Sequence, residues 1–213
     1  DSALLIQFLM DLPGDNEFLL GNHEELFLRM LEFTNNSKHV FLSLVNGGDR
    51  TIMSYIQNEH IFKARGYKMV EFEVLGEYQR ISFSIPQEHI DFLKSLKLRY
   101  EDENFHYAHA GFRPLVHPGD QEDHDLLWIG NEFLYSGELF GGKKVVHGHT
   151  VTKTHRPEIH PNRIAIDIGC GKNGHLACMC VDGYTLESRM EANMRFYTRI
   201  HDDLDILEKI TEF

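Results

Sequence analysis

The sequence predicts a mixed α/β protein, with helices in its first half and short strands in its second half. Apolar residues recur at helical spacing over residues 2–12, 22–33 and 86–96. From Leu98 onward they gather instead in short runs bounded by turn-forming residues, a pattern typical of strands. This change of spacing between the two halves indicates the fold class.

The first half holds four predicted helices. They cover residues 2–12, 22–33, 49–56 and 86–96. A short apolar run at residues 17–21 predicts a strand directly before the second helix. Residues 63–83 show no clear period, and we expect a mixture of loop and helix there.

The second half contains shorter elements. We expect a hairpin with arms at residues 98–100 and 105–108, a buried element at 126–134, and strands at 144–147, 164–168 and 176–181. Residues 186–213 are strongly charged and helical in pattern. The predicted organisation is the C-terminal majority of one domain over residues 1–183, followed by a charged helical tail over residues 184–213.

Composition and charge exclude several classes of partner. The formal net charge is −12 and no run of Lys or Arg forms a basic stripe, which argues against nucleic acid or an anionic membrane as the main partner. No apolar stretch has the length of a transmembrane helix. The cysteines, Cys170, Cys178 and Cys180, are odd in number and fit reduced core thiols, so we expect a cytoplasmic protein.

Three short motifs combine histidine or asparagine with glycine where a strand is expected to end. They are Gly21-Asn22-His23-Glu24, His109-Ala110-Gly111 and Gly148-His149-Thr150. Imidazole and carboxamide groups together suit divalent Mn, Fe or Zn. Carboxylate ligands would be expected beside them, and this chain offers none in an equivalent motif.

Each of these residues also has an ordinary structural interpretation. Asn22 can simply cap the following helix, and His23 can be an exposed histidine at its start. His109 can be a core residue of its strand. His147 and His149 alternate along one strand end, so their spacing alone does not say which of them is a ligand.

In order and spacing, the three motifs resemble the later signatures of the calcineurin-like metallophosphoesterases. The chain closely resembles the bacterial serine/threonine phosphoprotein phosphatases related to phage lambda phosphatase and to the symmetrical diadenosine tetraphosphatases. The likeness extends to about Gly183 and includes residues 109–114, 126–129, 145–150 and 162–167. It implies a metallophosphoesterase-type β-sandwich flanked by helices, here lacking its first strands.

The resemblance also implies roles for the motif residues. Asn22, His109 and His149 would bind the second of two divalent metals, with manganese expected first and iron or zinc as alternatives. His23 would be the general acid that protonates the leaving alkoxide, and Glu24 would support the site from the start of the helix. A hydroxide bridging the two metals would attack phosphorus. The substrate would be a phosphorylated protein or a small phosphate ester.

Two further residues are weaker candidates. Arg113 could reach a phosphate from the loop after His109, and a structural arginine is an equal alternative. Asp167 could hydrogen-bond a ligand histidine, as carboxylates beside metal ligands often do. The resemblance favours His149 over His147 as ligand, which leaves His147 as a packing residue or as a residue that supports a ligand.

The sequence departs from the family pattern in ways that affect function. The first two family motifs, D-x-H and G-D-x-x-D-R-G, are absent, and we expect them upstream of Asp1. Relatives carry arginine where this chain has Gly130. At most one metal site is then partly formed, and residues 1–213 alone are expected to be inactive. The leading hypothesis is a serine/threonine protein phosphatase; the alternatives are a diadenosine tetraphosphatase or other small-molecule phosphatase, and a non-catalytic remnant or binding protein.

Overall fold

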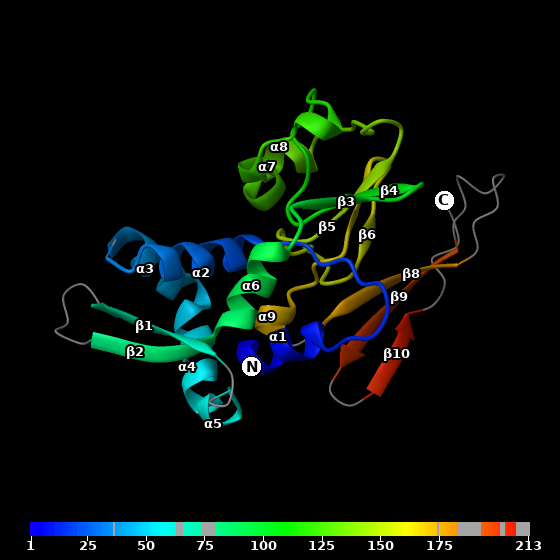
Figure 1. Cartoon of the computed structure of the whole chain (residues 1–213). Coiled ribbons are helices and arrows are strands. Elements are labelled where there is room, and N and C mark those ends of the chain that lie inside the picture. Colours follow the sequence, from blue (N-terminus) through cyan, green and yellow to red (C-terminus); the bar gives the residue numbers. More distant parts are fainter. Residues whose placement is uncertain are drawn as a thin grey trace. The chain divides into compact units, whose positions relative to one another are not determined.

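The computed structural model divides into two compact units, residues 1–97 and residues 98–213. The structure describes residues 1–35, 37–62, 66–73, 80–173, 175–182, 193–200 and 203–207. Helices and sheets are both present, which confirms the predicted mixed α/β class (Figure 1). No helix in these ranges combines the length and the apolar character needed to cross a bilayer. The division into a domain over 1–183 and a tail over 184–213 stays a prediction.

The first unit is built mainly of helices. They are α1 (Ser2–Met10), α2 (Asn22–Glu32), α3 (Ser37–Ser43), the π-helical turn η1 (Leu44–Gly48), α4 (Asp49–Gln57), α5 (Glu59–Phe62) and α6 (Gln87–Ser95). The four predicted helices are confirmed by α1, α2, α4 and α6. The strand predicted at residues 17–21 is not a full strand: Leu19 forms an isolated bridge with Lys97, because no second strand extends the pairing.

The strands of the first unit are β1 (Tyr67–Glu73) and β2 (Arg80–Pro86), which pair antiparallel. The prediction of loop and helix over residues 63–83 is therefore wrong for the described part of that range. Val70 and Phe72 on β1 are buried, as are Phe83 and Ile85 on β2. The two-residue spacing of these side chains is the strand period, which the predicted mixture overlooked.

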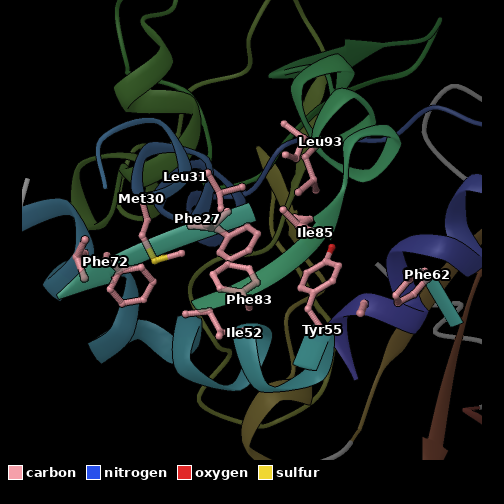
Figure 2. Close-up of a cluster of buried hydrophobic side chains, with 14 residues drawn as sticks. Phe27, Met30, Leu31, Ile52, Tyr55, Phe62, Phe72, Phe83, Ile85 and Leu93 are labelled. Atoms are coloured by element: carbon pink, nitrogen blue, oxygen red, sulfur yellow. The ribbon is translucent and has the colours of Figure 1, made fainter. Parts of the chain in front are cut away.

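The core of the first unit joins the two strands to the helices around them (Figure 2). The Phe27 ring of α2 stacks on the Tyr55 ring of α4, with 6.3 Å between centroids.

Within this core, His89 is hydrogen-bonded to two other side chains. The Nε2–H of buried His89 donates to Gln7 Oε1 over 3.1 Å, so Nδ1 accepts from the Tyr55 hydroxyl, also over 3.1 Å. Burial raises the pKa of Tyr55 well above its usual value and keeps the hydroxyl a donor.

The second unit contains a five-stranded sheet with the order β3-β4-β5-β7-β6. Its strands are β3 (Arg99–Glu101), β4 (Phe105–Ala108), β5 (Lys144–His147), β6 (Glu158–Ile159) and β7 (Arg163–Ala165). The central strands β4, β5 and β7 run parallel, and the two outer strands are antiparallel to their neighbours. The predicted hairpin is confirmed by β3 and β4, and the strand predicted at residues 164–168 is shorter than expected.

Short helical elements connect these strands. They are η2 (Pro118–Asp120), α7 (Asp123–Trp128), α8 (Asn131–Leu134) and α9 (Cys170–Asn173). The buried element predicted at residues 126–134 is confirmed as the end of α7 and the whole of α8, with Leu126, Leu127 and Phe133 buried. Cys170 and Cys178 are exposed, so their assignment to the core is wrong.

The predicted helical tail is wrong in its described part. Strands β8 (Ala177–Asp182), β9 (Asn193–Ile200) and β10 (Asp203–Leu207) form an antiparallel three-stranded sheet. The sequence Met194-Arg195-Phe196-Tyr197-Thr198-Arg199-Ile200 is rich in aromatic and β-branched residues and alternates with a period of two. This alternation outweighs the helical pattern that predicts a helix over residues 186–213.

Burial of His106 on β4 predicts an acid-sensitive second unit. Its Nε2–H donates to the Phe140 carbonyl over 2.9 Å, while Nδ1 lies 3.5 Å from a Glu101 carboxylate oxygen. Burial lowers the pKa of His106 below its ordinary value, with partial opposition from Glu101. Below about pH 6.5 the unfolded chain binds a proton that the folded chain does not, so stability falls as the pH is lowered, by at most about 1.4 kcal/mol per pH unit from this group.

The test compares urea unfolding of the wild type and His106→Gln at several pH values, followed by Trp128 fluorescence. Glutamine can still donate to the Phe140 carbonyl but does not titrate. We expect a shallower loss of stability below pH 6.5 in the variant. Equal slopes in the two proteins would contradict this role of His106.

Candidate metal centre

The two motif histidines of the second unit follow neighbouring parallel strands. Ala108, the last residue of β4, lies opposite His147, the last residue of β5. The chain therefore leaves both strands at one edge of the sheet, and Gly148 N–H donates to the His109 carbonyl over 2.9 Å. The carboxyl ends of parallel strands are where α/β proteins commonly bind ligands.

His149 has an unusual backbone conformation. Its φ angle is +63°, in the left-handed region that most side chains avoid. The Thr150 N–H donates to the Gly148 carbonyl over 2.6 Å, so His149 is the central residue of a three-residue turn. Such conformations cost on the order of 1–3 kcal/mol and cluster at functional sites.

The side chains of His109 and His149 meet. Their ring centroids are 5.1 Å apart and the ring planes are inclined by 64°. An imidazole binds a divalent cation through one nitrogen at about 2 Å, so two rings sharing a cation have centroids about 5 Å apart. The pair therefore fits two ligands of one metal. Within the described residues, no group of three or more His, Cys, Asp or Glu side chains is arranged to hold a metal ion.

Trp128, the last residue of α7, lies beside His149. The two ring centroids are 6.0 Å apart and the planes nearly perpendicular, at 79°. A backbone hydrogen bond of 2.8 Å from Ala110 N–H to the Leu126 carbonyl ties α7 to the loop after β4. Trp128 is also the only tryptophan in the chain.

His147 is engaged in packing. It is 1% exposed, and its Nδ1–H donates to the Gly148 carbonyl over 3.0 Å. Its Nε2 accepts from the Arg163 guanidinium over 3.3 Å. Burial, with the cation of Arg163 beside it, lowers the pKa of His147 to about 4, so this ring is neutral near pH 7. Both ring nitrogens are occupied, as the packing interpretation expects.

Asp167 lies at the same edge, two residues after β7. Backbone pairing continues beyond the strand, because Ile166 N–H donates to the His147 carbonyl over 3.0 Å. The Asp167 carboxylate accepts from Gly169 N–H over 2.9 Å, and a Cβ added at Gly148 would lie 3.8 Å from the Asp167 Cβ. A hydrogen bond from Asp167 to a ligand histidine stays a prediction.

Arg113 is paired with carboxylates. Its Nε donates to Asp125 Oδ2 over 2.6 Å, a second nitrogen bonds Asp125 Oδ1, and Nη1 lies 3.1 Å from Glu132. The hydrogen bonds and charge of Asp125 raise the pKa of the guanidinium above its usual value. Because Asp125 is buried, this bidentate pair has the geometry of a structural contact. The phosphate-binding role of Arg113 stays a prediction.

The first motif begins α2 in the first unit. Gly21, not Asn22, is the capping residue: its backbone is extended, and Asn22 is already the first helical residue and is buried. Asn22 therefore does not cap α2. The Glu24 carboxylate accepts from Gly21 N–H over 3.1 Å, a bond that stabilises the helix start. Support of the metal site by Glu24 stays a prediction.

His23 is exposed and bonded to a neighbouring turn. Its Nδ1 lies 2.8 Å from the Asn46 carbonyl. A carbonyl only accepts, so Nδ1 carries the proton, and Nε2 of the neutral ring is a hydrogen-bond acceptor. Asn46 and Gly47 interrupt the helical geometry of η1, with φ of +90° at Gly47, and this kink places the carbonyl.

Sequence reasoning did not assign the roles of Trp128 and Asn46. Trp128 stood in a segment used for the family resemblance, but nothing in its spacing predicts contact with His149. The glycine pair after Asn46 signalled a turn and not the carbonyl that His23 contacts. No family model matches the chain, and a search of curated proteins finds no significant match.

Proposed function

We propose that this protein is a metal-dependent phosphoesterase with the metallophosphoesterase type of β-sandwich, in which His109 and His149 are ligands of one divalent metal. The observation that supports it best is the contact of these two rings at the carboxyl edge of parallel strands. The left-handed backbone of His149 adds support, since strain of this kind is retained where it orients a functional side chain. The resemblance of the three motifs supplies the reaction class.

The residues of this chain then have distinct roles. Divalent cations bound at such a site activate water and neutralise phosphate charge. The resemblance adds Asn22 as a third ligand. His23 donates a proton to the leaving oxygen when its ring is an imidazolium, because both nitrogens then carry hydrogen. Its Nδ1 bond to the Asn46 carbonyl holds the ring, which leaves Nε2 for the substrate.

The resemblance favours a phosphorylated serine or threonine of a protein as substrate, and the odd number of cysteines favours a cytoplasmic location. A diadenosine tetraphosphatase or another small-molecule phosphatase is the alternative within the same chemistry. A non-catalytic binding protein is the alternative of another class. Gly130 bears on this choice, because members of the resembled family carry a phosphate-binding arginine there. A Cβ added at Gly130 meets no atom within 4 Å, so a Gly130→Arg variant introduces no clash at its Cβ.

Metal titration tests the proposed centre. We expect addition of Zn²⁺ or Mn²⁺ to change the fluorescence of Trp128 saturably at one equivalent, because its ring lies 6.0 Å from that of His149. Asn22→Ala should weaken binding if the third ligand is correctly assigned. Absence of any saturable change, confirmed by calorimetry, would remove the support for the metal centre.

Catalysis is tested separately with p-nitrophenyl phosphate and Mn²⁺. Residues 1–213 are expected to show negligible turnover, because the ligands of the first metal are not among them. A polypeptide that also includes in-frame D-x-H and G-D-x-x-D-R-G motifs upstream should hydrolyse the substrate. Metal binding without turnover in that longer polypeptide would favour the binding-protein alternative.

A further inference from the structure

A pocket of about 430 Å³ lies within the first unit. Its volume is in the range of small-molecule sites, about 300–1,000 Å³. Helices α1, α2, α4 and α6 and the turn η1 contribute to it. Its apolar lining includes Leu5, Leu9, Phe18, Phe27, Phe92 and Leu96.

Polar residues also line the pocket. His23 and Asn46 both line it, and the bond between His23 Nδ1 and the Asn46 carbonyl leaves Nε2 of the neutral ring as an acceptor. Glu24 also lines the pocket, but its carboxylate accepts from the Gly21 backbone. The pocket thus combines a mainly apolar wall with an imidazole that can accept a hydrogen bond from a hydroxyl group.

The wall is suited to a flat ring. Phe18 and Phe92 form an edge-to-face pair with 5.4 Å between centroids. Phe27, also in the wall, is held by stacking on Tyr55. Aromatic walls in fixed orientations favour aromatic ligands, which pack edge-to-face or offset against them.

We propose that this pocket binds the aromatic alcohol part of an aryl phosphate ester, so that the substrates are aryl phosphate monoesters. The inference rests on the proposed function, in which His23 protonates the leaving oxygen. A general acid must lie within hydrogen-bond reach of that oxygen, so the leaving alcohol occupies the space beside His23. A serine or threonine side chain has too little apolar surface to fill this space. The pocket therefore argues against phosphoserine and phosphothreonine, the substrates that the family resemblance favours.

The test measures binding of 4-fluorophenol to the metal-free chain by ¹⁹F NMR, so its outcome does not depend on the metal centre. Leu5→Glu places a charge in the pocket wall and should weaken binding at least about tenfold. Phe8→Glu is the matched control: both side chains are exposed on α1, at 55% and 59%, but Phe8 does not line the pocket. We expect the control to bind within twofold of the wild type.

Competition identifies the source of the aromatic alcohol. Displacement by N-acetyl-tyrosinamide would indicate a tyrosine of a peptide, and displacement by free phenols alone a small molecule; either outcome supports the pocket. Absence of saturable binding would overturn it, as would equal loss in both variants or equal competition by N-acetyl-serinamide. If 4-fluorophenol binds but the metal titration shows no binding, the pocket is confirmed as a site for aromatic alcohols. Its role in holding the leaving group is then refuted together with the proposed function.

Discussion

Replacing His149 with alanine should lower the affinity of the chain for Zn²⁺ by at least about 100-fold. Loss of groups that merely orient a metal ligand costs about 10–100-fold, so loss of a ligand should cost more. His109→Ala should have the same effect, because the two rings are 5.1 Å apart and would share one cation. The measurement is calorimetric titration, with Trp128 fluorescence as a second signal.

Two controls separate ligand loss from damage to the fold. His124→Ala removes an exposed histidine of α7 and should leave the affinity unchanged. His149→Gly removes the ring while relieving the left-handed backbone, at φ of +63°. That variant should be about 1 kcal/mol more stable than the wild type and still lose the metal. Unchanged affinity in both ligand variants would show that the metal lies elsewhere.

Gly111→Ala should destabilise the second unit by about 3 kcal/mol or more. A Cβ at this position would lie 2.2 Å from a ring carbon of Phe133, far inside contact distance. The backbone also has φ of +142°, which side chains rarely adopt. Phe133 cannot move aside, because it is fully buried against Phe140 and His147.

The matched control is Gly137→Ala, in the same unit. A Cβ there meets no atom within 4 Å, and the residue has no positive φ. Its free energy of unfolding should change by less than about 1 kcal/mol. Urea unfolding followed by Trp128 fluorescence compares the two variants. Equal stability of Gly111→Ala and the wild type would show that the His109-Ala110-Gly111 loop can accept a side chain.

The elements with a clear period were predictable. Helices α2 and α6 carry apolar residues at helical spacing, and the arms of the β3–β4 hairpin flank an obvious turn. Strand β2 was missed although Ile81, Phe83 and Ile85 alternate with serines. A short alternating segment with few turn-forming residues around it is hard to tell from a loop by sequence. Pairing with β1 is what makes residues 80–86 a strand. The tail differs, because the helical pattern across residues 186–213 conceals the shorter alternation of β9.

The site was predictable only where it depends on strand ends. His109 and His149 were expected after two strands, and parallel pairing of β4 with β5 accounts for their contact. The placement of Trp128 beside His149 and of Asn46 beside His23 depends on how helices pack and kink, which spacing along the chain does not reveal. Arg113 illustrates the same limit, because its partner Asp125 lies on a helix whose orientation the sequence leaves open.

The register of β5 against β4 and β7 also bears on which length changes the chain can accept. Successive side chains of a strand point to opposite faces, so one extra residue between Lys144 and His147 would turn the following histidines over. His147 would then lose Arg163, and His149 would turn away from His109. Natural variants of this protein should therefore differ in length in the loops that enter the parallel strands, while the strands and the short turns that leave them keep a constant number of residues.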